Sequence, residues 1–478
     1  MSNEDIAYAA FLKSKAITIQ NTGFDVPRDT LNRGLFDWQR DIVYWALRKG
    51  KAALFEDCGA GKAFQSLEWS RQVHLHTGKP VLIVTPLAVA EQTRREGAKF
   101  GIESKVCREN NEIMNGINIT NYEILDHFEL AQFAGVVLDE SSILKAYDGK
   151  TKQAIVDSFR ETPYKLSCTA TPSPNDYMEL GNQAEFLGVM TRGEMLATFF
   201  VHDGGDTSKW RLKGHAESKF WEWVASWAVV LTNPADLGYD GSDYVLPPLN
   251  VEQITVRTDV DNSVGEQLAM FASTAQTLTE RREARRSSLK ERCEAAKRLK
   301  EKEPGEQWLF WVDLNAEADE LKSIMPDAVE VRGTDTPEYK SDKLNGFTVG
   351  DVRCLISKPS IAGFGLNWQC CHNMVFVGLS DSYEMLYQAM RRCWRFGQTH
   401  PVNVYIVISE QEGAVKENIE RKERQAATMQ AEMVKFTKTI LEKEIRGTCR
   451  ETIEYNPQIQ MIIPEWCREE KELQWRKI

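Results

Sequence analysis

Residues 52–69 read AALFEDCGAGKAFQSLEW, and this stretch decides the fold. The apolar run 52–55 predicts a buried strand, and the run from Phe64 onward predicts a helix. Small residues between them let backbone N–H groups curl around phosphate oxygens, while the helix N-terminus adds a positive dipole end. The stretch predicts a phosphate loop in which Lys62 supplies a charge to the β- and γ-phosphates. Its members are Asp57, Cys58, Gly59, Ala60, Gly61, Lys62 and Ala63.

A carboxylate pair follows another predicted strand. Residues 135–138 read GVVL, and Asp139 and Glu140 come directly after them. Ligands bind beyond the carboxyl ends of parallel strands, so both carboxylates are expected beside the phosphate loop. A phosphate-bound Mg²⁺ needs an oxygen ligand, the role expected of Asp139. Hydrolysis needs a group that orients the attacking water, the role expected of Glu140.

Two further motifs carry polar side chains. Residues 169–172, TATP, follow the apolar segment 164–168 and are interpreted as a link from the γ-phosphate site to a nucleic-acid face, with a plain turn as the alternative. Gln388, Arg392 and Arg395 stand at i, i+4 and i+7, so on a helix they share one face. Two guanidinium groups pointing across a cleft would neutralise charge spreading onto a departing γ-phosphate. A basic helix face that binds nucleic acid is the alternative.

Short apolar runs alternate with helical stretches in two blocks, from Leu35 to about Asn175 and from Gln307 to about Ile408. This alternation predicts parallel sheets with crossover helices, hence an α/β fold with two parallel-sheet lobes in tandem. The predicted strands are 52–55, 81–84, 135–138, 308–311, 353–356, 374–377 and 404–407. The expected domains are an N-terminal extension (1–30), lobe 1 (31–189), an insertion (190–304), lobe 2 (305–409) and a helical tail (410–478).

The expected insertion differs in composition from the two lobes. Its tryptophans at helical spacing are expected to pack inward, and a charged helical stretch from Glu266 to Lys302 follows. Arginine pairs at 281–282 and 285–286, one helical turn apart, are interpreted as a solvated helix face, with contact to a nucleic-acid duplex as the alternative. The tryptophans are Trp210, Trp221, Trp223 and Trp227.

Composition limits the classes of function. The net charge of −11 argues against a protein that coats nucleic acid by bulk electrostatics, so a nucleic-acid site must be a local basic track. The apolar runs are shorter than the roughly 20 residues of a membrane span, and the acidic, polar N-terminus is unlike a secretory signal. We therefore expect a cytoplasmic protein. The ten cysteines are expected to be reduced, and Cys370-Cys371-His372 lacks a second ligand pair for zinc.

In this order the motifs resemble those of superfamily 2 helicases, in particular Swi/Snf-type duplex-DNA translocases and the small versions found in bacteriophages. The resemblance spans Phe36 to Val407. Gln39 resembles the adenine-reading glutamine, 85–87 motif Ia, 119–122 motif Ib, 139–142 motif II and 167–172 motif III. Residues 360–367 resemble motif V, and 388–398, ending RFGQ, resemble motif VI in its most Swi/Snf-like form.

The resemblance implies two RecA-like lobes with ATP and Mg²⁺ in the cleft between them and nucleic acid, expected to be duplex DNA, across their tops. Gln39, Gly365 and Gln388 join the phosphate loop as ATP-binding candidates, and Lys62, Glu140, Arg392 and Arg395 are the catalytic candidates. Because phosphate contacts position a protein without reading bases, little sequence specificity is expected. The candidate nucleic-acid contacts are Thr85, Thr120, Asn121 and Ser360.

The sequence also departs from the family pattern. Ala63 stands where the family has Thr or Ser, and Trp394 replaces a usual His. Two alternatives to the translocase remain open. A strand-separating RNA or DNA helicase should carry a pin or hairpin, which the sequence does not reveal. A non-catalytic ATP-gated clamp would bind both ligands without turnover, and Ala63 is the residue that favours it.

Overall fold

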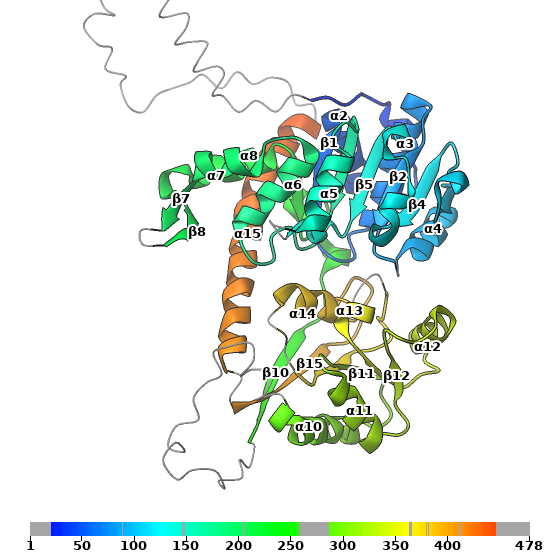
Figure 1. Cartoon of the computed structure of the whole chain (residues 1–478), viewed down its shortest axis with the longest axis vertical. Helices are drawn as coiled ribbons and strands as arrows, with labels where there is room; N and C mark the ends of the chain where they lie inside the picture. The colour runs from blue at the N-terminus through cyan, green and yellow to red at the C-terminus, as the bar shows by residue number, and fades with distance from the viewer. Residues whose placement is uncertain are drawn as a thin grey trace, which may run out of the picture.

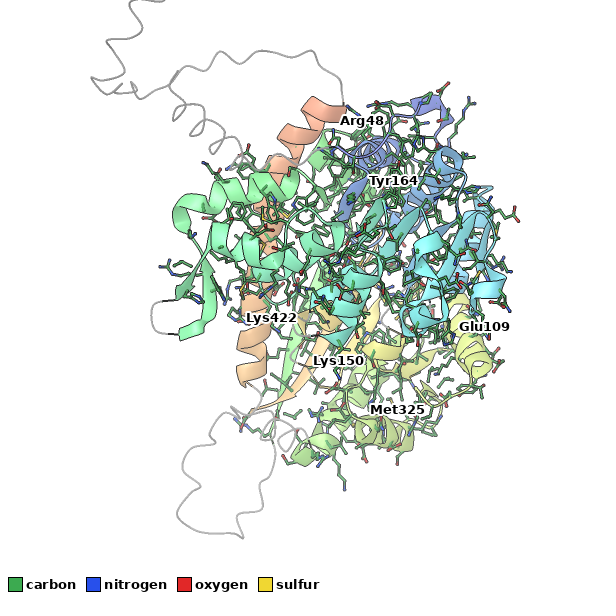
Figure 2. The ribbon with its side chains drawn as sticks, turned by 45° about the horizontal axis from the view of Figure 1, so that its top comes forward. Arg48, Glu109, Lys150, Tyr164, Met325 and Lys422 are labelled. Carbon is green, nitrogen blue, oxygen red and sulfur yellow. The ribbon has the colours of Figure 1, made fainter. Side chains whose placement is uncertain are left out.

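The computed structural model describes residues 21–87, 89–145, 149–203, 206–257, 286–362, 366–378, 380, 382–410 and 413–445. They form two α/β lobes stacked along the long axis of the molecule, with the long helix α15 beside both (Figure 1). Side chains fill both lobes, with Tyr164 in lobe 1, Met325 in lobe 2 and Lys422 on α15 (Figure 2). Several predicted features lie outside the described residues: Gly365, the arginines 281, 282 and 285, most of the N-terminal extension, and residues 446–478 of the tail.

Lobe 1 contains a seven-stranded, all-parallel sheet in the order β3-β4-β2-β5-β6-β1-β9. Every residue of β2 is buried, as expected for a parallel strand covered on both faces. The strands are β1 Lys51–Glu56, β2 Val81–Thr85, β3 Ser104–Val106, β4 Ile117–Asn121, β5 Gly135–Asp139, β6 Tyr164–Cys168 and β9 Ala228–Leu231. The helices are α2 Asp37–Lys49, α3 Lys62–Thr77, α4 Ala90–Lys99, α5 Lys150–Ser158, α6 Leu180–Leu187, α7 Arg192–Phe199 and α8 Glu217–Ala225.

Lobe 2 contains a six-stranded parallel sheet in the order β10-β15-β14-β11-β13-β12. The two parallel sheets confirm the predicted fold class. The strands are β10 Leu249–Val256, β11 Trp308–Trp311, β12 Val329–Val331, β13 Cys354–Ser357, β14 Asn373–Phe376 and β15 Val402–Ser409. The helices are α10 Leu289–Lys302, α11 Asn315–Ile324, α12 Pro337–Val349, α13 Pro359–Ala362 and α14 Tyr383–Met390, and α15 Gly413–Ile445 follows and packs on both lobes.

Short 3-10 helices lie in the connections, most of them in lobe 1. They are η1 Arg28–Thr30, η2 Asn110–Glu112, η3 Tyr122–His127, η4 Leu130–Gln132, η5 Ser141–Lys145, η6 Tyr177–Glu179, η7 Gly214–Ala216, η8 Pro234–Leu237 and η9 Ser242–Tyr244.

The expected insertion 190–304 is divided between the lobes. Its strand β9 pairs with β1 at the edge of the lobe 1 sheet, and β10 pairs with β15 at the edge of the lobe 2 sheet. The helix α10 packs on lobe 2, where Cys293 and Ala296 join the same core as Trp308. Since β9 and β10 extend the two sheets and α10 packs on lobe 2, the described part of residues 190–304 does not form a separate unit.

The tryptophans of this segment pack inward, as predicted. Trp221 and Trp227 are fully buried, and Trp223 is nearly so. They belong to one core cluster with Phe220 and with β9, and Trp210 packs against its edge. This cluster fixes α8 on lobe 1.

An antiparallel hairpin that the sequence did not reveal joins α7 to α8. It pairs β7 Phe200–Asp203 with β8 Asp206–Leu212. The buried Phe200 anchors its base, whereas Val201 and His202 are exposed. The hairpin projects from lobe 1 on the side of α7 and α8 (Figure 1).

Candidate nucleotide site between the lobes

The predicted phosphate loop connects β1 to the first turn of α3. Gly59 and Gly61 have φ values of 94° and 81°, a region that side-chain-bearing residues rarely adopt. A Cβ atom at Gly61 would lie 2.5 Å from Nε2 of Gln39. Lys62 curls back over the loop, where its Nζ donates to the carbonyl oxygens of Glu56 at 2.7 Å and Asp57 at 3.1 Å. The loop therefore has the geometry expected of a phosphate cradle, with its cation in place.

Gln39 contacts the loop from α2. Its Nε2 donates to the carbonyl oxygen of Ala60 at 2.8 Å, and its Oε1 accepts from the N–H of Phe36 at 3.0 Å. Two aromatic side chains stand close by: Tyr244, between the lobes, stacks on Phe396 of lobe 2 with ring centroids 4.7 Å apart. The predicted adenine-reading residue thus lies at the loop, beside an aromatic contact between the lobes.

Asp139 and Glu140 lie at the carboxyl end of β5, two strands from β1 in the sheet, as predicted. Burial and the charge of Glu140 raise the pKa of Asp139 to about 7, and burial also raises the pKa of Glu140. Glu140 has a φ of 54°, the one positive value among the described residues other than glycine. A positive φ at a residue other than glycine costs on the order of 1 kcal/mol of conformational free energy, and such residues cluster at functional sites.

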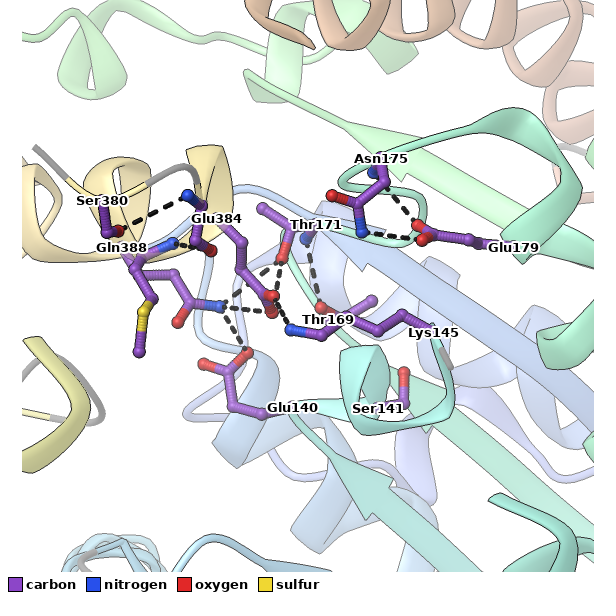
Figure 3. A network of polar contacts seen from close by, with 12 residues as sticks. Glu140, Ser141, Lys145, Thr169, Thr171, Asn175, Glu179, Ser380, Glu384 and Gln388 are labelled. Carbon is purple, nitrogen blue, oxygen red and sulfur yellow. Dashed lines mark hydrogen bonds and ion pairs between the residues drawn. The ribbon is translucent and has the colours of Figure 1, made fainter. Parts of the chain in front are cut away.

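A polar network joins the two lobes around Glu140 (Figure 3). Gln388 of α14 donates through Nε2 to Oε2 of Glu140 and to Oγ1 of Thr171, at 3.5 and 3.4 Å. The hydroxyl of Thr171 in turn donates to Glu384 at 3.4 Å, and Lys145 forms an ion pair with the same carboxylate. The predicted segment 169–172 therefore contacts lobe 2 rather than forming a plain turn.

The two predicted arginines lie in the turns after α14, not on the helix itself. The helix ends at Met390. Nε of Arg392 donates to the carbonyl oxygen of Gln388 at 3.0 Å, and the N–H of Arg392 donates to the carbonyl oxygen of Ala389. Arg392 and Arg395 both donate to the carbonyl of Leu366 at 3.3 Å. Burial and the nearby Arg392 lower the pKa of Arg395 to about 10. Two guanidinium groups thus lie side by side in lobe 2.

Two residues that the sequence did not indicate reach the phosphate loop from lobe 2. Tyr387 donates its hydroxyl proton to Oδ1 of Asp57 at 2.5 Å, and Nη2 of Arg391 lies 2.7 Å from Oδ2 of the same residue. Arg391 also donates to the carbonyl of Cys58 at 2.7 Å. The available signal was that Arg391 directly precedes the expected pair Arg392 and Arg395. The i, i+4, i+7 spacing from Gln388 selects that pair and leaves Arg391 off the shared face.

The chemistry of the site fits a nucleotide with Mg²⁺. The positive-φ glycines, Lys62 and the start of α3 form a cradle for anions, and Asp139 is an oxygen donor beside it. Buried guanidinium nitrogens without a protein partner, Nε of Arg395 and both Nε and Nη1 of Arg391, supply further donors. Ala63 is half-buried at the second position of α3 and contributes a methyl group where an oxygen ligand was expected.

The candidate nucleic-acid contacts differ in exposure. Thr85 and Thr120 are fully buried and Asn121 nearly so, which leaves their side chains no access to a phosphate in this arrangement. Ser360 is exposed and lines a cavity of about 200 Å³ at the carboxyl ends of β11 and β13, together with Asp313 and Lys358. Of the four candidates, only Ser360 is exposed to solvent.

Comparisons with known proteins bear on the class of the chain. Residues 289–397 match the model of the helicase conserved C-terminal domain, a range that includes Gln388, Arg392 and Arg395. The ATP-dependent helicase fft1 of Schizosaccharomyces pombe is 24% identical over 166 residues, which are 34% of this chain and 17% of that protein. The chain therefore spans less than a fifth of that relative's length.

A solved structure also aligns with most of the chain. It is the SWI2/SNF2 ATPase core of Sulfolobus solfataricus in complex with dsDNA, with a TM-score of 0.41 and 16% identity over 89% of this chain and 98% of that one. The domain match and the helicase relative confirm the resemblance to superfamily 2 helicases that the motifs predict. Among the described residues, no helix has the length and apolarity to cross a bilayer.

Proposed function

We propose that the chain is a nucleic-acid-dependent ATPase that couples hydrolysis to translocation along DNA, or remodelling of it, with duplex DNA as the substrate. The observation that carries this proposal is the polar contact across the cleft, in which Gln388 of lobe 2 reaches Glu140 of lobe 1 at 3.5 Å. Glu140 directly follows β5, which lies two strands from β1 and its phosphate loop, and Arg392 and Arg395 follow Gln388. Residues from both lobes would thus act on one phosphate group.

Each residue has a distinct role in this proposal. Lys62 holds the β- and γ-phosphates, and Gln39 recognises the base beside the loop. Asp139 holds Mg²⁺ and Glu140 orients the attacking water. Arg392 and Arg395 stabilise the negative charge that develops on the transferred group, an effect worth about three to five decades in rate. When bound, ATP would supply the phosphoanhydride bond that is broken, and Mg²⁺ would supply a Lewis acid.

Coupling to movement follows from the position of these residues on two bodies. A ligand that contacts the loop of lobe 1 and the arginines of lobe 2 favours the closed arrangement, and loss of the γ-phosphate removes that preference. Each cycle would shift one lobe relative to the other along a nucleic-acid strand. Ser360, exposed beside the cavity in lobe 2, is the candidate that remains best placed to contact a phosphate.

A strand-separating helicase is the second candidate, because the molecule carries a projecting hairpin, the kind of element that this class is expected to use. The hairpin β7–β8 projects from lobe 1 and exposes His202, whose ring packs on Trp210 with centroids 3.7 Å apart. Aromatic side chains of this kind stack on nucleic-acid bases in other proteins. The same ATP site would serve either activity.

The test compares ATP hydrolysis without polynucleotide and with single-stranded DNA, duplex DNA or RNA. We expect duplex DNA to stimulate most, with stimulation that falls steeply as salt rises because phosphate contacts release counterions. Displacement of a third strand should exceed separation of a plain duplex. Stimulation by RNA alone would reject the duplex-DNA proposal in favour of a helicase.

The variant Glu140→Gln checks that the measured hydrolysis belongs to this site. It should bind ATP and DNA as the natural chain does but lose turnover, because water orientation is lost while Asp139 is retained. Turnover in Glu140→Gln equal to that of the natural chain would exclude Glu140 from its proposed role.

A further inference from the structure

Asp57, in the phosphate loop of lobe 1, is held mainly by lobe 2. Its Oδ2 pairs with Nη2 of Arg391 at 2.7 Å, and its Oδ1 accepts from Tyr387 at 2.5 Å. Within the loop, Oδ1 also accepts from the N–H of Cys58 at 2.6 Å. The carboxylate of Asp57 therefore accepts three hydrogen bonds, two of them from residues of lobe 2.

The pair is largely removed from water. The side chain of Arg391 is 3% exposed and that of Asp57 is 17% exposed. Burial acts to lower the pKa of Arg391, but Asp57, Tyr387 and Cys58 together outweigh it, so the pKa is raised. The guanidinium lies over the ring of Trp394, 4.9 Å from its centroid. In such surroundings charges interact strongly, and removing one partner leaves the other uncompensated.

The position of Asp57 gives the pair a consequence for nucleotide binding. Asp57 directly precedes Cys58-Gly59-Ala60-Gly61, the residues expected to surround phosphate oxygens, and Lys62 bonds to its carbonyl. A free carboxylate at this point would repel the phosphates, since like charges close together in a buried site are unfavourable. Arg391 cancels that charge from the opposite lobe.

We propose that Arg391 is a positioning residue that neutralises Asp57, so that the affinity of the phosphate loop for a nucleoside diphosphate depends on contact between the lobes. The inference rests on the proposed function in assuming that the loop binds nucleotide. It concerns the diphosphate and therefore differs from the role of Arg392 and Arg395, which act on the terminal phosphate. Tyr387 supports Arg391 by holding the second oxygen of Asp57.

Lobe contact and nucleotide affinity are then linked in both directions. Anything that brings lobe 2 onto lobe 1 raises the affinity for nucleotide, and nucleotide raises the stability of the contact by the same factor. Polynucleotide bound across both lobes would tighten nucleotide binding without touching the loop. This gives a physical route by which DNA stimulates the enzyme.

The test measures binding of ADP with Mg²⁺ by titration calorimetry to the full chain and to three variants. Arg391→Gln should weaken binding by about tenfold or more, which corresponds to about 1.4 kcal/mol per decade. Asp57→Asn should tighten binding, because the amide still accepts hydrogen bonds and leaves Arg391 as an uncompensated cation beside the phosphates. The double variant should bind about as tightly as the natural chain.

The opposite signs of the two single variants separate this role from a structural one. If the ion pair only held the fold together, both variants would weaken binding, and that result would overturn the inference. Thermal melting shows whether Arg391→Gln folds. If it does not, the direction in which Asp57→Asn changes the affinity for ADP still decides between the two roles. Arg332→Gln, which removes an exposed arginine paired with Asp319 and Glu330 in lobe 2, is the matched control and should bind ADP normally.

The steady-state constants provide a second readout. Arg391→Gln should raise the KM for ATP more than it lowers kcat, whereas a residue that meets charge only in the transition state lowers kcat. A fall in kcat with unchanged KM would reject the positioning role. Absence of ADP binding by the natural chain would reject the proposed function together with this inference, whereas normal binding by Arg391→Gln would reject the inference alone.

Discussion

Glu56 is fully buried at the end of β1, directly before the phosphate loop. Burial raises its pKa from 4.5 to about 7, although Lys62 and a hydrogen bond from Gln65 act in the opposite direction. The folded state thus holds this proton more tightly than the unfolded state. The resulting stabilisation is present below pH 4.5 and is lost as the pH rises to about 7.

Glu56→Gln should remove this pH dependence. At pH 4 the variant and the natural chain should unfold at similar temperatures, because both groups are neutral and similar in shape. At pH 8 the variant should be more stable, by on the order of 2 kcal/mol, because no buried carboxylate is ionised. Thermal unfolding at the two pH values checks this, and a parallel response of both proteins would contradict it.

Ala63 is the residue that decides between an enzyme and a clamp. The usual hydroxyl at this position would coordinate Mg²⁺ directly, but Mg²⁺ readily keeps several waters, and one of them can take the vacant position. We therefore expect an active ATPase with a high Mg²⁺ requirement. Ala63→Thr should lower the Mg²⁺ concentration for half-maximal turnover and raise kcat.

Turnover measured against Mg²⁺ concentration for both forms tests this expectation. Ala63→Ser, which adds the hydroxyl without the extra methyl group, is the matched variant. If the natural chain is inert at every Mg²⁺ concentration while Ala63→Thr hydrolyses ATP, the natural chain is a clamp.

At the residue scale, the sequence predicted the positions that follow a strand and missed those that depend on the partner lobe. Lys62, Asp139 and Glu140 are defined by their place after β1 and β5, a local property that the apolar runs reveal. Arg391 and Tyr387 reach Asp57 only because two lobes far apart in sequence are in contact. Thr85 and Thr120 were assigned by motif, and their burial depends on packing that a motif does not encode.

At the element scale, the strands predicted from long apolar runs were found close to their expected bounds, whereas most of the missed strands are short or lie at a sheet edge. The interior strand β4 was missed as well, because polar residues interrupt its apolar pattern. The strand β12 has three residues, and β10 is an edge strand whose residues are mostly exposed, so neither has a continuous apolar pattern. The missed β9 follows the tryptophans of α8, which suggested one helical segment. The omission of β9 and β10 made residues 190–304 look like an insertion.

The hairpin β7–β8 is the element whose role in strand separation can be tested. His202 pairs with Trp210 across the hairpin, and their rings are in contact. If the hairpin separates strands, replacing both residues with alanine should abolish unwinding of forked DNA and leave duplex-stimulated ATPase within about twofold, since the nucleotide site is untouched. Unwinding assays with a forked substrate measure the effect.

A change on the opposite face of the hairpin serves as the control. Val201 pairs with Arg211 and is 37% exposed, so Val201→Ala should leave unwinding unchanged. If the natural chain does not unwind forks and displaces a third strand equally well with or without the aromatic pair, the hairpin has no role in strand separation.

At the scale of the whole molecule, α15 connects the two lobes a second time. Ile419 belongs to the core of lobe 2, whereas Met429 and Met433 belong to the core of lobe 1. The hydroxyl of Tyr177 donates to the carbonyl of Gln425 at 3.2 Å. The helix was predicted as part of a tail, but its middle is buried against lobe 1, and it lies beside both lobes in Figure 1.

This second connection holds the arginines of lobe 2 near the phosphate loop, so weakening it should affect the DNA-free reaction most. Met433→Ala removes a fully buried side chain, a change that costs roughly 2–5 kcal/mol of packing free energy. We expect ATP turnover without DNA to fall several-fold, because the lobes separate more often. At saturating duplex DNA the loss should be smaller, since DNA holds both lobes, and the stimulation ratio should therefore rise. Arg424→Ala, at an exposed position of the same helix, should change neither rate. An equal loss with and without DNA would show that α15 supports lobe 1 alone and does not set the contact between the lobes.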